Sequence, residues 1–231
     1  MNTDRLDADS FDASLSLLDR QVVDVEGLAV CKVDDLEISF YDDGSDPAVT
    51  RILTGPAALE PRMSTRTGHW LRGYWKSLGI QYADRDVPLA VELGDIARVG
   101  SAVELSVERE GLLDRQPPPV EGVTLRRMGE LIGSSVTGDG RGHPKEKVLD
   151  VRLLPGDERY VIDALLVGPG RPGSLLGYDR GDFNGPALVN AVVGWLHRHS
   201  REVPWSDVED VDWEAGTVRV RMDRAAAGHS S

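Results

Sequence analysis

The sequence predicts a mainly β protein built from two small, tandem β-barrels, each with one inserted amphipathic helix. Two observations lead to this fold class. Short apolar or alternating runs, which are typical of strands, recur along the 231-residue chain. The second half of the chain also repeats the blocks of the first half in the same order. Small curved sheets that close into barrels leave few strand edges bare, and this favours barrels over open sheets.

Six blocks of the first half have counterparts in the second. They are 17–23 with 131–137, 27–38 with 142–153, 49–56 with 162–169, 68–78 with 185–196, 87–88 with 203–204, and 102–107 with 217–222. One or two such matches could arise by chance, but six in order indicate a duplication. We therefore expect the two halves to fold alike, with Trp205 buried at the position that corresponds to Leu89.

Strands are predicted where apolar residues alternate or run together between Gly, Pro, Asn and Asp clusters. The predicted strands are 19–25, 28–40, 47–54, 86–91 and 102–108, and then 134–138, 146–154, 159–167, 201–205 and 216–222. One helix is predicted after the third strand of each half, because apolar residues recur there at i, i+1, i+4, i+5 and i+8. The stripe residues are Trp70, Leu71, Tyr74, Trp75 and Leu78, and Leu188, Val189, Val192, Trp195 and Leu196.

The repeat and the composition together predict the domain organisation. We expect an acidic N-terminal tail at 1–14, a first repeat at 15–111, a proline-rich linker at 112–123, a second repeat at 124–223 and a C-terminal tail at 224–231. The run Pro117-Pro118-Pro119 favours a stiff, extended linker.

Charge and composition exclude several classes of function. With 39 acids and 26 bases the net charge is −13, which disfavours binding to nucleic acid or to an anionic membrane. The lone Cys31 excludes an intrachain disulfide, and the N-terminus lacks the pattern of a secretory signal. The most apolar window, 187–196, is too short for a membrane span. These features predict a cytoplasmic protein without a transmembrane segment.

A G-x-G-x-x-G pattern occurs at Gly168, Gly170 and Gly173, after a predicted strand. A dinucleotide-binding turn must open directly into a helix and offer amide donors to a phosphate. Pro169 and Pro172 remove two of these donors, and glycines interrupt the following segment before a helix could complete two turns. The pattern is better explained as a turn that leaves a barrel strand, so no cofactor is predicted.

Other catalytic and metal-binding patterns are incomplete. The five histidines show no metal-ligand spacing, and the acidic pairs lack the spacing of a calcium loop. No G-x-S-x-G motif is present. The sequence therefore predicts no catalytic residue, no cofactor-binding residue and no metal ligand, and the protein is not expected to be an enzyme.

Three blocks of the second half carry a family resemblance. The segments "MGELIGSSVTGDGRGHPKEKVLDVRLL", "YVIDALLVGPGRPGSLLGYDR" and "REVPWSDVEDVDWEAGTVRVR" resemble the PRC-barrel family, whose name comes from the cytoplasmic barrel of the photosynthetic reaction-centre H subunit. The resemblance covers nearly all of 128–222 and, more faintly, 15–108. The first half departs from the pattern at Asp19, where the family prefers glycine. The resemblance implies a β-barrel fold and a docking role without shared catalytic residues.

The sequence thus favours a non-catalytic protein-interaction or scaffold module, with protein partners or self-association and no direct binding to nucleic acid. A ribosome-assembly or RNA-processing accessory factor stays open as an alternative, as does a small-ligand-binding protein or an enzyme with an unrecognised site. The predicted partner-binding residues combine arginine with apolar and aromatic side chains, as interfaces do. They are Arg171, Leu175, Leu176, Tyr178, Arg180 and Phe183.

Overall fold

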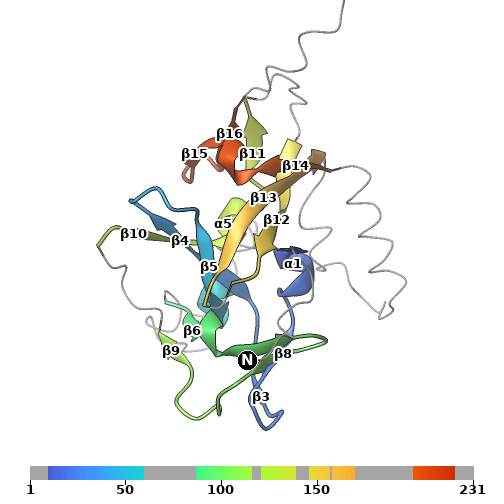
Figure 1. Ribbon diagram of the computed structural model, residues 1–231, viewed down its shortest axis with the longest axis vertical. Helices are drawn as coiled ribbons and strands as arrows, with labels where there is room; N and C mark the ends of the chain where they lie inside the picture. The colour runs from blue at the N-terminus through green and yellow to red at the C-terminus, as the bar shows by residue number, and fades with distance from the viewer. Residues whose placement is uncertain are drawn as a thin grey trace, which may run out of the picture. The chain divides into compact units, whose positions relative to one another are not determined.

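In a computed structural model, the fold is mainly β, with a large curled mixed sheet, a small four-stranded sheet and a few short helices (Figure 1). The structure describes residues 10–59, 87–115, 121–138, 146–156, 158–169 and 200–221. The chain divides into two compact units. The first comprises Met1–Gly129 and Leu153–Ile162, and the second comprises Glu130–Arg152 and Asp163–Ser231. These units are not the two halves of the sequence, because residues 121–129 and the 153–162 hairpin belong to the first unit.

The first unit contains most of the short strands. Its elements are β1 (Phe11–Asp12), α1 (Ala13–Ser16), β2 (Gln21–Val23), β3 (Ala29–Lys32), β4 (Asp35–Tyr41), β5 (Ala48–Thr54), α2 (Pro56–Leu59), β6 (Leu89–Glu92), η2 (Leu93–Asp95), β7 (Ile96–Val99), β8 (Val103–Leu105), β9 (Asp114–Arg115) and β10 (Val123–Arg127). The order β10-β4-β5 forms one sheet, in which β6 pairs with both β5 and β9. The order β3-β2-β8-β7 forms the small sheet. The strand β1 and the start of α1 therefore lie within the segment that the sequence assigns to an acidic tail.

The second unit is built around longer strands. Its elements are β11 (Ser135–Thr137), β12 (Glu146–Leu154), β13 (Tyr160–Pro169), β14 (Arg201–Pro204), η3 (Trp205–Asp207), β15 (Val208–Asp212) and β16 (Thr217–Val220). The sheet order is β13-β12-β11-β16-β15, and β14 pairs with β13. The short helix α5 (Met128–Leu131) begins in the first unit. The end of β12 and the start of β13 also belong to the first unit.

Each unit buries a core of aliphatic side chains that alternate along its strands. In the first unit the fully buried residues include Leu36, Ile38, Ile52, Leu53 and Leu93. In the second they include Val148, Val151, Leu165, Val167 and Val218. Burying such a side chain is worth about 1.5–3 kcal/mol, so these strands are held mainly by their inward faces. Branched side chains also suit the pleated strand, which explains why these segments adopt it.

The strand pairings of the first half recur in the second. β2 pairs antiparallel with β3 and parallel with β8, and β11 pairs antiparallel with β12 and parallel with β16. β7 and β15 each pair antiparallel with the strand that follows, and each has a register shift near its start. β5 pairs with β6 as β13 pairs with β14. Four of the six matched sequence blocks, those that start at 17, 27, 49 and 102, therefore carry matched hydrogen-bonded pairings.

The turn before β2 shows the repeat at atomic detail. Asp19 has φ 64° and is the one non-glycine residue with a positive φ in the described ranges, and the matching Gly133 has φ 91°. The Asp19 amide donates to the carbonyl of Val33 at 2.8 Å, and the Gly133 amide donates to the carbonyl of Val148 at the same distance. A left-handed conformation is ordinary for glycine and tolerated by aspartate. This explains why Asp19 can stand at the position where the second half has glycine.

This geometry predicts that substitutions at the two turns change the free energy of unfolding by unequal amounts. Gly133→Ala is expected to lower the free energy of unfolding by about 1–2 kcal/mol, because a Cβ disfavours the left-handed region. Asp19→Gly is expected to change it by less than about 0.5 kcal/mol, since strain relief offsets the added chain entropy and the exposed Lys32 ion pair contributes little. Denaturant titration of both variants measures the difference. Equal losses at the two sites would show that the turns are not equivalent.

Most predicted strands are confirmed, with three differences. The predicted strand 28–40 is divided into β3 and β4, while β12 runs unbroken over the matching residues. β7, β10 and β15 were not predicted, and β9 and the start of β10 lie within the predicted linker. The two predicted helices, at 68–78 and 185–196, lie outside the described residues.

The predicted place of Trp205 in the repeat is wrong, although its side chain is largely buried, as predicted. β14 and η3 follow one another as β6 and η2 do, so Trp205 corresponds to Leu93 and not to Leu89. Leu93 is 1% exposed, whereas Trp205 is of intermediate exposure. The match of Val-Pro at 87–88 with 203–204 is wrong for the same reason. Truncating Trp205 should therefore cost less than the roughly 3–5 kcal/mol expected for a buried aromatic side chain.

Candidate functional site

The predicted partner-binding residues, from Arg171 to Phe183, lie outside the described residues, so that surface stays a prediction. The strand that leads to it is described. β13 runs to Pro169, and Gly168 is buried within it. In the matching position of the first half, Gly55 has φ 95° and Asp34 accepts a hydrogen bond from the Gly55 amide at 2.8 Å. The first Gly-Pro pair thus forms a tight turn into α2, while the second continues a strand.

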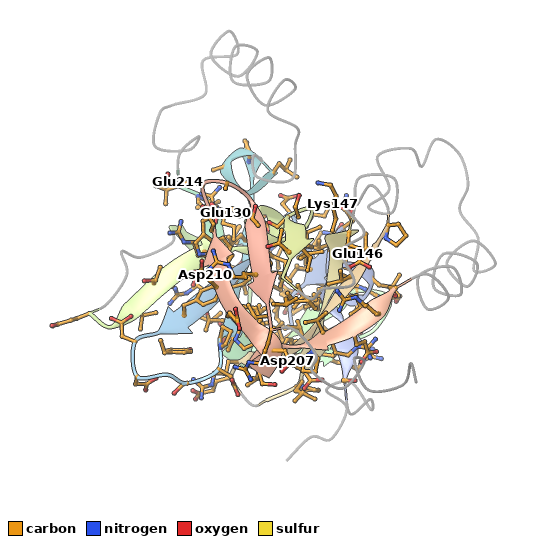
Figure 2. All side chains as sticks on the ribbon, turned by 90° about the horizontal axis from the view of Figure 1, so that it is seen from above. Glu130, Glu146, Lys147, Asp207, Asp210 and Glu214 are labelled. Atoms are coloured by element: carbon orange, nitrogen blue, oxygen red, sulfur yellow. The ribbon has the colours of Figure 1, made fainter. Side chains whose placement is uncertain are left out.

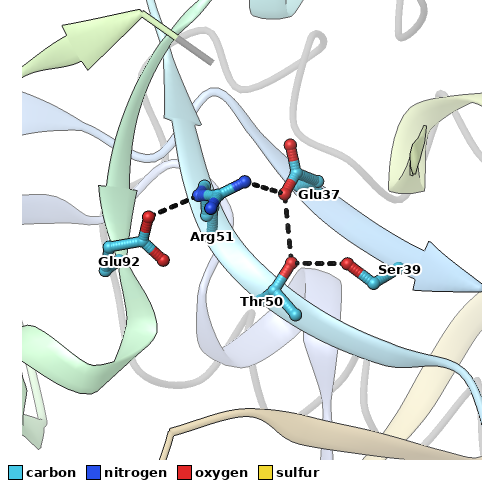
Figure 3. Close-up of polar contacts among 5 residues, drawn as sticks. All are labelled: Glu37, Ser39, Thr50, Arg51 and Glu92. Atoms are coloured by element: carbon cyan, nitrogen blue, oxygen red, sulfur yellow. Dashed lines mark hydrogen bonds and ion pairs between the residues drawn. The ribbon is translucent and has the colours of Figure 1, made fainter. Parts of the chain in front are cut away.

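A buried charged network crosses three strands of the first unit (Figure 3). Arg51 on β5 donates through Nη1 to Glu37 Oε1 at 2.8 Å and through Nε to Glu92 Oε1 at 2.6 Å. Thr50 Oγ1 donates to Glu37 Oε1 at 3.1 Å and lies 3.0 Å from Ser39 Oγ. The Glu37 side chain is fully buried, and that of Arg51 is 20% exposed. The strand register accounts for this contact, because Glu37 lies directly opposite Arg51 in the β4–β5 pairing.

The network is suited to holding strands together. Burial acts to lower the pKa of Arg51, but the hydrogen bond that Arg51 donates to Glu92 and the charge of Glu37 outweigh it, so that the pKa lies above its ordinary value. Arg51 therefore stays charged and compensates two carboxylates at once. The acceptor oxygen of Glu37 already receives two hydrogen bonds, so this oxygen is poorly placed to take a proton from a substrate. We assign the network a structural role.

Cys31 is the one nucleophile of interest on the small sheet. Burial raises the pKa of its thiol to about 11. A hydrogen bond with Thr54 acts to lower this pKa, and the charge of Asp34 adds a smaller increase. The thiolate is the reactive form of cysteine. The environment of Cys31 therefore suppresses nucleophilic chemistry near neutral pH.

Alkylation kinetics test the state of Cys31. At pH 7.5, iodoacetamide should modify it about three-hundredfold more slowly than an exposed thiol with an ordinary pKa of ~8.5, because its thiolate fraction is smaller by that factor. The rate should keep rising up to about pH 11, the pKa of the buried thiol. Asp34→Asn removes the negative charge but keeps an acceptor for Gly55, and it should shift the curve to lower pH. A rate that levels off near pH 8.5 in the native protein would contradict this assignment.

The described ranges do not meet the requirements of a metal site or of a membrane-spanning helix. No group of three or more His, Cys, Asp or Glu side chains there is placed to hold a metal ion. Within the same residues, no helix has the length and apolar character needed to span a bilayer.

The strand β15 of the second unit combines an open edge with strong negative charge (Figure 2). Within the described part of the chain it pairs with β16 alone. Five of the eight residues from Asp207 to Glu214 are acidic and none is basic. Glu209, Asp210, Asp212 and Glu214 are exposed. This strand was not predicted from the sequence.

Apolar side chains accompany these acids. Val208, Val211 and Trp213 are of intermediate exposure, although Val208 and Val211 lie opposite the buried Val220 and Val218. Asp210 lies 3.8 Å from Arg219 on the neighbouring strand, and Asp212 accepts a hydrogen bond from the Ala215 amide at 2.9 Å. The edge thus offers backbone groups, partly covered apolar surface and carboxylates on one strand.

No protein-family model matches the chain, and no curated protein matches it in sequence.

Proposed function

We propose that the chain is a non-catalytic protein-interaction module made of two PRC-barrel-like repeats. In this proposal each half is a small barrel with one inserted helix, and the module presents strand edges and loops to a protein partner. The observation that carries the proposal is the recurrence of the strand pairings. The parallel pairs β2–β8 and β11–β16 lie beside matching antiparallel pairs. Such a duplicated small-sheet plan supports the resemblance read from the sequence blocks.

The chemistry of the described residues supports binding over catalysis. The buried Glu37 is neutralised by Arg51, and the thiol of Cys31 has a raised pKa. The edge of β15 with which no described strand pairs, by contrast, offers backbone groups and exposed charge, the features by which a sheet binds another chain.

Affinity capture from the native cell tests this function. The intact protein, immobilised under near-physiological salt, is expected to retain one or a few specific proteins above a control of similar charge. Ribosomal proteins among them would favour the alternative of a ribosome-assembly factor. A co-purifying small molecule without any protein would contradict the proposal and favour a ligand-binding role. Loss of the partner on replacing Arg171, Tyr178 and Arg180 by Ala would place the interface on residues 170–183.

A further inference from the structure

We infer that β15 binds an extended, basic segment of a partner protein, which adds to the sheet as a further strand. This inference rests on the proposed function and names both the surface and the chemistry of its partner. The surface, called here the β15 edge, consists of β15 (Val208–Asp212) with the flanking Asp207, Trp213 and Glu214.

The backbone of β15 is the first part of the case. β16 pairs with one side of β15, and no other described strand pairs with the opposite side. The register shift lies between Val208 and Asp210, and from Asp210 to Asp212 the pairing with β16 is regular. A regular edge strand presents outward-pointing N–H and C=O groups at alternate residues, and these are the groups that a further strand uses.

The side chains provide a second and independent observation. Val208, Val211 and Trp213 keep part of their apolar surface exposed. On the neighbouring strand β16, by contrast, Val218 and Val220 are buried. An added strand places alternate side chains on each face of the sheet, so it would cover this apolar row on one face. Tryptophan is also among the residues that contribute most at interfaces, and its ring attracts cations.

Charge decides which segment fits. Asp210 and Asp212 lie on the face opposite to Val211, and Glu209 and Glu214 are exposed beside them. A lysine or arginine at every second position of the added strand would lie against these carboxylates, where opposite charges across strands are favourable. A second copy of this chain fits poorly, because each copy carries a net charge of −13.

The first half contains a natural comparison. β7 occupies the position of β15, yet it has Ala97 and Arg98 where β15 has Glu209 and Asp210. Arg98 is already held by Glu104, through Nε at 3.0 Å and through Nη2. The matched edge therefore lacks the acidic row, and the inference assigns the basic partner to β15 only.

A peptide-binding experiment on the full chain tests the inference. The probe is a synthetic peptide of about ten residues that alternates Lys with Val, and its binding is followed by calorimetry and by tryptophan fluorescence. We expect saturable binding that weakens with added salt. A peptide of the same composition with N-methylated alternate amides, which cannot pair as a strand, should bind at least about tenfold more weakly.

Matched charge variants assign the binding to β15. Glu209→Lys with Glu214→Lys is expected to weaken binding of the alternating peptide by about tenfold or more. Neither side chain makes a hydrogen bond or ion pair within the described residues, so the variant should keep its melting temperature. Glu26→Lys with Glu108→Lys changes two exposed acids in the first unit and gives the same net charge. This control should bind the peptide within about twofold of the unmodified protein.

Three results would overturn the inference. They are equal loss of binding in both double variants, equal binding of the N-methylated peptide, and no binding of the alternating peptide at all. The first would mean that only overall charge matters, and the second that no strand is added. The function proposed above is judged separately. If captured native partners stay bound to the Glu209→Lys, Glu214→Lys protein, the interaction role stands and the β15 edge is not its site.

Discussion

Arg51→Ala is expected to lower the free energy of unfolding by about 3–5 kcal/mol, because it removes a charged guanidinium that donates a hydrogen bond to a buried carboxylate. Glu37 is 0% exposed, and Arg51 donates to it at 2.8 Å from the neighbouring strand. Thr50 supplies a neutral hydrogen bond to the same oxygen and cannot replace a guanidinium. Denaturant titration of the full chain, with a probe in the first unit, measures the loss.

Two further variants separate charge compensation from packing. Glu92→Gln removes the exposed member of the network, which is 58% exposed, and should cost less than about 1 kcal/mol. Replacing Glu37 and Arg51 together by Met removes both charges and should recover much of the stability lost in Arg51→Ala. If Arg51→Ala and Glu92→Gln cost the same, Arg51 is not compensating a buried charge.

Gly138→Ala is expected to lower the free energy of unfolding by about 2–4 kcal/mol, because both backbone conformation and space exclude a side chain there. Gly138 follows β11 with φ 103°, and a Cβ would lie 2.6 Å from the carbonyl oxygen of Val220. That oxygen belongs to β16, which pairs with β11, so relief would require the two strands to separate.

Gly94→Ala provides the matched control for this prediction. Gly94 lies in η2, has no positive φ, and a Cβ there would meet nothing within 4 Å. It should change stability by less than about 0.5 kcal/mol. Thermal and denaturant unfolding of the two proteins, compared side by side, gives the answer. Similar stabilities for both would contradict the close approach of Gly138 to β16.

Local pattern predicted the strands whose side chains alternate or are β-branched. β5, β12 and β13 are of this kind, and their bounds agree closely with the sequence. β15 was missed because three of its five residues are acidic and have low strand propensity. Its strand conformation comes from pairing with β16, a contact that no local pattern records. β10 was missed for a similar reason, since its partner β4 is distant in sequence.

The candidate sites could not be predicted from the sequence, because they depend on the register in which the strands pair. Arg51 lies 14 residues from Glu37 and 41 from Glu92, and only the pairing of β5 with β4 and β6 brings the three together. The misplacement of Trp205 has the same origin, because a shared Val-Pro pair suggested an alignment that the strand order does not support. Asp19 was noted in the sequence only as a departure from the glycine of the second half, and its left-handed conformation was not predicted.

Hydrogen–deuterium exchange on the complex with a captured native partner tests the central claim most directly, because it locates binding on the intact chain. If the protein is an interaction module that docks its partner on the β15 edge, the amides of Val208–Asp212 exchange more slowly in the complex. The amides of the matching strand Ile96–Val99 then exchange as before. Unchanged exchange at Val208–Asp212, with protection elsewhere in the chain, would contradict the claim.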